Sequence, residues 1–205
     1  MTNNIQLSFF DTQNYDGEID DWTFNKASTR ELTHCYHDYP ARMIPQVAGK
    51  LIDNFGLSAK YLFDPYCGSG TSLVEANIRG INAIGTDLNP LARLVSLAKT
   101  SRPMIDFLES QIVNFSKLVL IDKLHKIKEH KEIYGITNLD FWFKPEVVER
   151  LLIIRDFIQD IDNEEVRLFF QVAFSETVRE SSNSRNGEFK LYRYDEEKLA
   201  KFHPD

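Results

Sequence analysis

The apolar positions between residues 61 and 85 follow a strand, helix and strand pattern. Tyr61, Leu62 and Phe63 form a short apolar run that is typical of a buried strand, and Asp64 ends it. Apolar residues then recur at helical spacing from residue 73 to residue 78, and residues 82–85 predict a second strand. Two short strands joined by a helix predict a βαβ unit, and therefore an α/β fold.

A turn with little side-chain bulk, Cys67-Gly68-Ser69-Gly70, joins the first strand to the helix. Glycine there permits a positive φ and lets another group lie close to the backbone. Thr71 or Ser72 is expected to cap the helix, and Arg79-Gly80 is expected to end it. The turn is therefore a candidate ligand-binding loop.

An acidic residue, Asp87, follows the second strand roughly 20 residues after the glycine turn, as in the ribose-binding arrangement of Rossmann-like folds. Asn89-Pro90 then begins another helix. The spacing is not that of a dinucleotide site, because Leu73 stands where G-x-G-x-x-G requires its third glycine. Asp64 would also repel a pyrophosphate. These features favour a nucleoside with an amine and hydroxyls but no phosphate, such as S-adenosyl-L-methionine; an ordinary βαβ unit with a tight turn is the alternative.

The rest of the chain is expected to be mainly helical. Helical patterns cover residues 44–55, 91–100 and 104–130, and Pro145 and Asn163 begin two more helices. Residues 189–192 alternate like a third strand. We expect one domain over residues 1–205: an N-terminal arm (1–30), a cofactor-binding core (31–100), and a helical region whose C-terminal segment faces a partner or DNA (101–205).

Composition narrows the classes of function. The 205 residues are 42% hydrophobic, which is enough for one domain with a core, and the net charge is −7. A self-sufficient DNA-binding domain is more often basic, so the main phosphate-binding surface is expected elsewhere. Two cysteines, Cys35 and Cys67, do not make a disulfide framework or a zinc site, and we expect no metal. No apolar run spans a membrane and the polar start is no signal peptide, so a cytoplasmic location is expected.

Three segments carry a family resemblance. DPYCGSGTS, which begins at Asp64, resembles motif I of the amino-methylating (N4-cytosine or N6-adenine) DNA methyltransferases, and GTDLNPLA, which begins at Gly85, resembles their motif II. Tyr39-Pro40-Ala41-Arg42, followed by a helix, is similar to motif X. A related signature occurs in some RNA methyltransferases, so the resemblance identifies the cofactor better than the substrate.

The resemblance implies a Rossmann-like fold that binds S-adenosyl-L-methionine. Motif X would close over the methionine end of the cofactor, Asp64 would attract its ammonium, Asp87 would accept from the ribose hydroxyls, and Leu88 would pack on the adenine. The implied cofactor-binding residues are Thr33, His34, Pro40, Ala41, Asp64, Pro65, Tyr66, Cys67, Gly68, Ser69, Gly70, Thr71, Ser72, Asp87, Leu88 and Asn89.

A second motif that such an enzyme needs is missing from these 205 residues. Transfer to an exocyclic amine requires (D/N/S)-P-P-(Y/F/W), which orients the amine and stacks on the flipped base, yet Pro-Pro occurs nowhere. The Pro-Cys nucleophile of a C5-cytosine enzyme is also absent, so we expect no catalytic residue on this chain.

The predicted sheet is also too small for a complete methyltransferase. The pattern predicts two convincing strands, and a sheet of that size would leave an open edge. The other strands must come from another chain or from sequence beyond Asp205. Because the printed sequence ends there, we expect a partial Rossmann-like fold completed by a second subunit that carries the Pro-Pro motif, with double-stranded DNA bound through the complex.

Two other functions remain open at this point. The same motifs permit a subunit of an RNA methyltransferase that acts on a guanine amine, in which case the partner would carry an RNA-binding module. A non-catalytic scaffold or sensor that binds the cofactor and regulates a larger complex is the other alternative.

Overall fold

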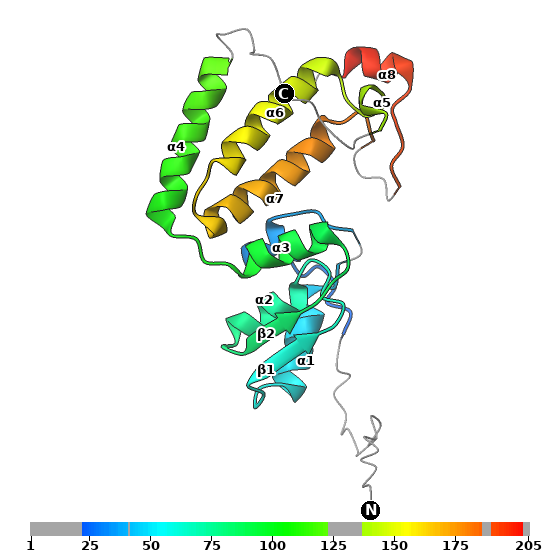
Figure 1. The fold of residues 1–205 in the computed structure, drawn as a ribbon. Helices are drawn as coiled ribbons and strands as arrows, with labels where there is room; N and C mark the ends of the chain where they lie inside the picture. The colour runs from blue at the N-terminus through cyan, green and yellow to red at the C-terminus, as the bar shows by residue number, and fades with distance from the viewer. Residues whose placement is uncertain (1–21, 41, 123–136, 186–189, 203–205) are drawn as a thin grey trace, which may run out of the picture.

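The computed structural model describes residues 22–40, 42–122, 137–185 and 190–202 (Figure 1). A small parallel sheet and the helices around it form one part, and most of the remaining helices form a second part beside it (Figure 1). The elements in chain order are η1 (Leu32–Cys35), α1 (Pro45–Phe55), β1 (Tyr61–Asp64), α2 (Thr71–Ile78), β2 (Asn82–Gly85), α3 (Pro90–Thr100), α4 (Ile105–Asp122), α5 (Leu139–Trp142), α6 (Pro145–Gln159), α7 (Glu164–Ser181) and α8 (Glu196–Lys201). The expected α/β class and helix-rich C-terminal half are confirmed.

The βαβ unit has the predicted order and a parallel register. Phe63 of β1 lies opposite Ile84 of β2, and Leu62 lies opposite Ala83. Leu62 and Ala83 face α1 and α2, where they pack against a buried cluster of Ile52, Ala76 and Ile81. One face of the sheet is therefore covered by two helices of the same chain.

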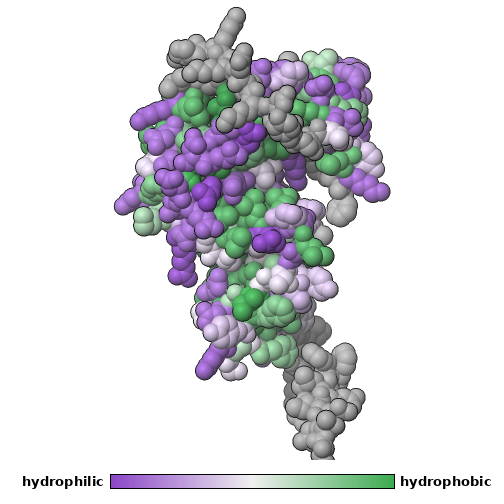
Figure 2. Space-filling view, in the orientation of Figure 1, coloured by the Kyte–Doolittle hydropathy of each residue, from purple (hydrophilic) through white to green (hydrophobic). Residues whose placement is uncertain are grey.

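The opposite face of the sheet is uncovered in the part of the chain that the structure describes. Tyr61 is 65% exposed, Phe63 63% and Ile84 54%. The prediction of a buried first strand is therefore wrong for this face, because an apolar run indicates what can be buried but not whether this chain supplies the cover. Hydrophobic side chains gather over the sheet-bearing part of the molecule in Figure 2.

Local sequence signals explain most helix boundaries. The Asn89 side chain accepts a hydrogen bond from the Leu91 N–H (3.0 Å) at the start of α3, and Asn163 does the same for Val166 (3.0 Å) at the start of α7. The expected cap of α2 is wrong, since neither Thr71 nor Ser72 makes a side-chain cap bond. Gly70 occupies the cap position instead, with a left-handed conformation that suits glycine.

The second part of the molecule is a helical layer made by α4, α6 and α7 (Figure 1). Its core is a buried cluster of Ile158, Ile161, Val166 and Phe170, against which residues of α4 pack. A second cluster joins the two parts, because Val95 and Ala98 of α3 meet Val172 of α7. Helix α3 is thus held between the sheet layer and the helical layer.

The third predicted strand is not observed. Phe189 lies outside the described residues, and Lys190 to Tyr192 form no strand; Ser184 and Arg193, which flank this segment, make a single antiparallel bridge. Most of the predicted arm (residues 1–21) also lies outside the described residues. None of the described helices is both long enough and apolar enough to cross a membrane.

Candidate cofactor-binding site

The glycine turn at the end of β1 is shaped by two left-handed glycines. Gly68 has φ +50° and Gly70 has φ +79°. A Cβ at Gly70 would lie 2.8 Å from the Cβ of Ser96, so only glycine lets α3 pack directly on the turn. A Cβ at Gly68 would meet nothing within 4 Å. The turn is therefore closed against α3 on one side and open in front of Gly68.

Asp64 lies at the end of β1, and its carboxylate is held by the turn. Its Oδ1 accepts from the backbone N–H of Tyr66 (3.0 Å), and its Oδ2 accepts from the hydroxyl of Ser72. Ser72 therefore orients this acid instead of capping α2. The carboxylate is partly exposed and keeps acceptor capacity for an incoming ammonium.

Asp87 lies beyond the end of β2, and its carboxylate bridges the two loops. Its Oδ2 accepts from the backbone N–H of Gly68 (2.9 Å), and its Oδ1 accepts from the N–H of Asn89 (2.8 Å). An ionised carboxylate has about four acceptor positions, so two remain for hydroxyl donors. The structure thus brings the second predicted acid against the predicted turn, at the carboxyl ends of two parallel strands, where ligands of open α/β sheets bind.

The remaining turn residues divide into buried and exposed groups. Ser69 and Thr71 are buried, whereas Tyr66 is 84% exposed and Leu88 97%. Pro65 is exposed, and its carbonyl accepts from the hydroxyl of Thr86 (2.8 Å). The exposed side chains offer apolar surface for a base next to the two acids.

Cys67 is unsuited to nucleophilic chemistry. Burial raises the pKa of its thiol, and the nearby carboxylates of Asp64 and Asp87 raise it further. A thiol with a raised pKa holds little thiolate near neutral pH. Its place in the site is structural.

The motif X segment lies beside motifs I and II. The hydroxyl of Tyr39 is 2.9 Å from Nδ2 of Asn89, which donates to it. Arg42 donates to the carbonyls of His34 (3.0 Å) and His37 (3.2 Å), and so holds the segment in a compact loop. Pro40 is exposed, and Ala41 lies outside the described residues. Helix η1, which contains Thr33 and His34, packs against α2 and α3.

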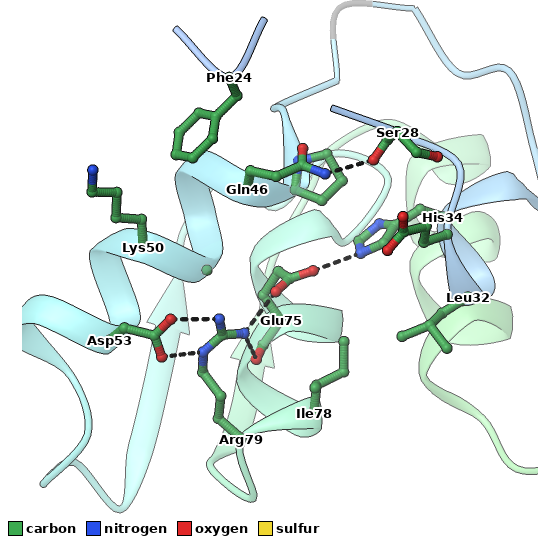
Figure 3. Close-up of a pocket in the computed structure, with 13 residues that line it drawn as sticks. Phe24, Ser28, Leu32, His34, Gln46, Lys50, Asp53, Glu75, Ile78 and Arg79 are labelled. Carbon is green, nitrogen blue, oxygen red and sulfur yellow. Dashed lines mark hydrogen bonds and ion pairs between the residues drawn. The ribbon is translucent and has the colours of Figure 1, made fainter. Parts of the chain in front are cut away.

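The side chain of His34 is directed to a polar network between η1, α1 and α2 (Figure 3). Its Nε2 lies 2.9 Å from Glu75 Oε1, Glu75 accepts from Arg79 (2.7 Å), and Arg79 forms two bonds to Asp53 (2.6 and 2.7 Å). Burial lowers the pKa of His34, and the hydrogen bond and charge of Glu75 act in the opposite direction.

This network lines a hollow of about 630 Å³. His34 borders the hollow, but none of the predicted site residues 64–72 and 87–89 does. Because the charged groups of the network are paired with one another, its role is to fix η1 on α1 and α2. Sequence reasoning missed the network; the four-residue spacing of Glu75 and Arg79 on one helix was the available signal.

A second anchor of the motif X segment was also missed. Glu176 of α7 accepts from the N–H of Asp38 (2.5 Å) and lies 3.3 Å from His37 Nδ1. Burial lowers the pKa of His37, with the charge of Glu176 acting in the opposite direction. No local pattern predicts a contact that joins residues so far apart in the chain.

Known methyltransferases resemble this chain in sequence. The chain is 42% identical over 198 residues to the Type II methyltransferase M.MvaI of Kocuria varians, which covers 89% of this chain and 41% of that protein. It is 32% identical over 120 residues to the Type II methyltransferase M.MjaII of Methanocaldococcus jannaschii, with 56% of this chain and 21% of that protein covered. The chain is therefore similar to Type II methyltransferases over part of their length. The resemblance carried by the motifs is thereby confirmed for the family, although the role of each motif residue stays a prediction.

The match to Type II methyltransferases is partial. The chain spans about two fifths of the length of M.MvaI and about a fifth of M.MjaII. No protein-family profile matches the chain, and no solved structure does. A shorter stretch of 52 residues, a quarter of this chain, is 35% identical to a tRNA (guanine(10)-N2)-dimethyltransferase of Methanothermobacter thermautotrophicus and covers 16% of it.

Proposed function

We propose that this chain is the S-adenosyl-L-methionine-binding subunit of a DNA methyltransferase that acts on an exocyclic amine, N4 of cytosine or N6 of adenine. The observation that carries the proposal is the meeting of Asp64, the glycine turn and Asp87 at one edge of the sheet, with Gly68 bonded to Asp87. The relatives named Type II methyltransferase support the reaction class.

The residues of the turn fit the chemical groups of this cofactor. The two carboxylates would accept hydrogen bonds from the methionine ammonium and the ribose hydroxyls, and charge strengthens such bonds. The open space in front of Gly68 lets a ligand approach the backbone, and exposed Leu88 offers an apolar surface to adenine. A bound cofactor supplies an electrophilic methyl group; this chain orients it and shields its methionine end with the motif X segment.

We further propose that a second polypeptide supplies the Pro-Pro motif and completes the sheet. Tyr61, Phe63 and Ile84 form an exposed apolar face on a two-stranded sheet, and such a sheet rarely persists without a cover. The DNA would then be bound mainly by the partner, in agreement with the net charge of −7 here.

Reconstitution tests this function directly. The chain is assayed alone and together with a partner that carries (D/N/S)-P-P-(Y/F/W), using labelled S-adenosyl-L-methionine and double-stranded DNA. We expect cofactor binding by this chain and label on DNA only when both are present. Full transfer by the 205-residue chain alone would refute the two-subunit arrangement, and transfer only when the chain is extended beyond Asp205 would assign the motif to the same polypeptide.

An RNA substrate is a second candidate, which the 35% identity over 52 residues to a tRNA (guanine(10)-N2)-dimethyltransferase supports. The reconstituted complex is therefore given transfer RNA in a parallel reaction. Label on RNA and none on DNA would favour this candidate over the first. Cofactor binding with no transfer to either would favour the scaffold or sensor.

A further inference from the structure

Lys99 is a buried cation that the proposed motifs do not use. It lies in the last turn of α3 and is 3% exposed. Among the described Asp, Glu, Lys and Arg residues, Glu75 is the other buried one, at 9% exposed. Glu75 is bonded to both Arg79 and His34. Lys99, in contrast, makes no ion pair with any described residue. A buried ammonium without an anion is costly, which requires an explanation.

The ammonium of Lys99 reaches the glycine turn. Its Nζ donates a hydrogen bond to the hydroxyl of Ser69 (3.4 Å), and Ser69 is 3% exposed. Ser96 lies one turn earlier on α3, where it closes against Gly70. The same face of α3 thus supports the turn with Ser96 and places a charge behind it with Lys99.

The groups whose charges act on Lys99 include Arg42, whose positive charge opposes its ammonium, and Cys35, which acts in the opposite direction. Arg42 of the motif X segment lowers the pKa of Lys99, and the charge of Lys99 lowers the pKa of both His34 and His37. Burial is the largest cause of the shift of Lys99, whose pKa falls to about 8. The end of α3 and the motif X segment therefore bring two cations, Lys99 and Arg42, into electrostatic contact, while Lys99 makes no ion pair with any described residue.

A second buried group, in η1, lacks a hydrogen-bond partner among the described residues. The hydroxyl of Thr33 in η1 is buried and makes no hydrogen bond, and η1 packs against both α2 and α3. A hydroxyl without a hydrogen bond and an ammonium without an ion pair are both suited to an anionic acceptor such as a carboxylate.

We propose that Lys99 binds the α-carboxylate of the methionine part of S-adenosyl-L-methionine, next to Ser69. This inference rests on the proposed function, which places the methionine end of the cofactor between motif I and motif X. It divides the amino-acid recognition between two sides of the turn: Asp64 takes the ammonium, and Lys99 takes the carboxylate. The ligand then supplies the anion that the buried ammonium lacks.

The experiment compares two ligands that differ only in the carboxylate, S-adenosyl-L-methionine and its decarboxylated form. Binding of each is measured by calorimetry with the full chain, in complex with its partner if the complex is needed. Lys99→Met should weaken the binding of S-adenosyl-L-methionine by roughly 10- to 150-fold, the range for a hydrogen bond to a charged group. The affinity for the decarboxylated ligand should stay nearly unchanged. Lys117→Met, an exposed lysine of α4, removes the same charge and should change neither affinity.

Each other outcome has a distinct meaning. Equal losses for the two ligands, or no loss for either, would overturn the role of Lys99. Failure of the wild-type chain and complex to bind either ligand would refute the proposed function itself. If Lys99→Met does not fold, Ser69→Ala provides the same comparison, with a smaller selective loss for the carboxylated ligand; equal effects on both ligands would then refute the proposal.

Discussion

Replacing Asp87 by alanine should weaken cofactor binding selectively through the ribose. The carboxylate holds the N–H groups of Gly68 and Asn89 and retains two acceptor positions toward the open side of the turn. Asp87→Ala removes both backbone hydrogen bonds and both free acceptor positions. Two separate losses are therefore expected, one in the stability of the fold and one in the binding of the ligand.

The binding loss follows from the type of bond. A hydrogen bond to a charged group contributes about 1.5–3 kcal/mol, which corresponds to a dissociation constant raised roughly 10- to 150-fold. The stability loss should be about 1–3 kcal/mol, because two backbone N–H groups lose a charged acceptor in a turn that water can reach. The stability of Asp87→Asn should lie between that of the alanine variant and that of wild type. The asparagine carbonyl oxygen accepts from one backbone N–H, whereas its NH₂ group faces the other N–H and cannot accept from it.

Calorimetry with a matched ligand pair separates the two losses. S-adenosylhomocysteine is compared with an analogue that lacks the ribose hydroxyls, for wild type, Asp87→Ala and the control Asp106→Ala, an exposed acid of α4. The hydroxyls should strengthen binding to wild type and to the control but not to Asp87→Ala. An unchanged affinity for S-adenosylhomocysteine, or an equal loss for both ligands, would refute the ribose assignment.

Three more predictions concern the partner, the motif X segment and the buried lysine. Phe63→Ser should weaken association with the partner by about 1.5–3 kcal/mol, the free energy of burying such a side chain, and leave cofactor affinity unchanged. If analytical ultracentrifugation shows equal association of wild type and variant, the exposed sheet face does not bind the partner. Glu176→Ala should raise hydrogen exchange at Asp38 and lower cofactor affinity several-fold, since it frees the motif X segment, whereas Glu180→Ala on the same helix should do neither. The pKa of Lys99 is lowered from its ordinary value of 10.5 to about 8, so the charged form is disfavoured in the fold. The cost of burying the charged ammonium is complete below pH 8 and disappears toward pH 10.5. The free energy of unfolding of the ligand-free protein should therefore rise over this interval by at most about 3 kcal/mol, as measured by denaturant titration. Lys99→Met should remove this rise.

The elements around the site could be predicted because their signals are local. Asn89 and Asn163 cap helices from adjacent positions. The apolar run at residues 61–63 and the short segment 82–85 predict two strands, which the structure pairs in parallel. The cap at Gly70 could not be chosen from sequence, because a hydroxyl at Ser72 suits a cap bond and a bond to Asp64 equally well.

The contacts that could not be predicted join distant parts of the chain. Glu176 reaches Asp38 across 138 positions, and His34 reaches Glu75 across 41. Periodicity states which face of an element is apolar or polar, but it does not state what that face meets. The exposure of Phe63 has the same origin: its pattern predicts burial, and the covering surface is not among the described residues.

Titration of S-adenosyl-L-methionine into the 205-residue chain, alone and with its partner, tests the central claim most directly. The account predicts saturable binding of one cofactor per chain, weakened roughly 10- to 150-fold when Asp87 is replaced by alanine and unchanged when Phe63 is replaced by serine. Absence of binding in both preparations, or binding that persists undiminished without Asp87, would contradict it.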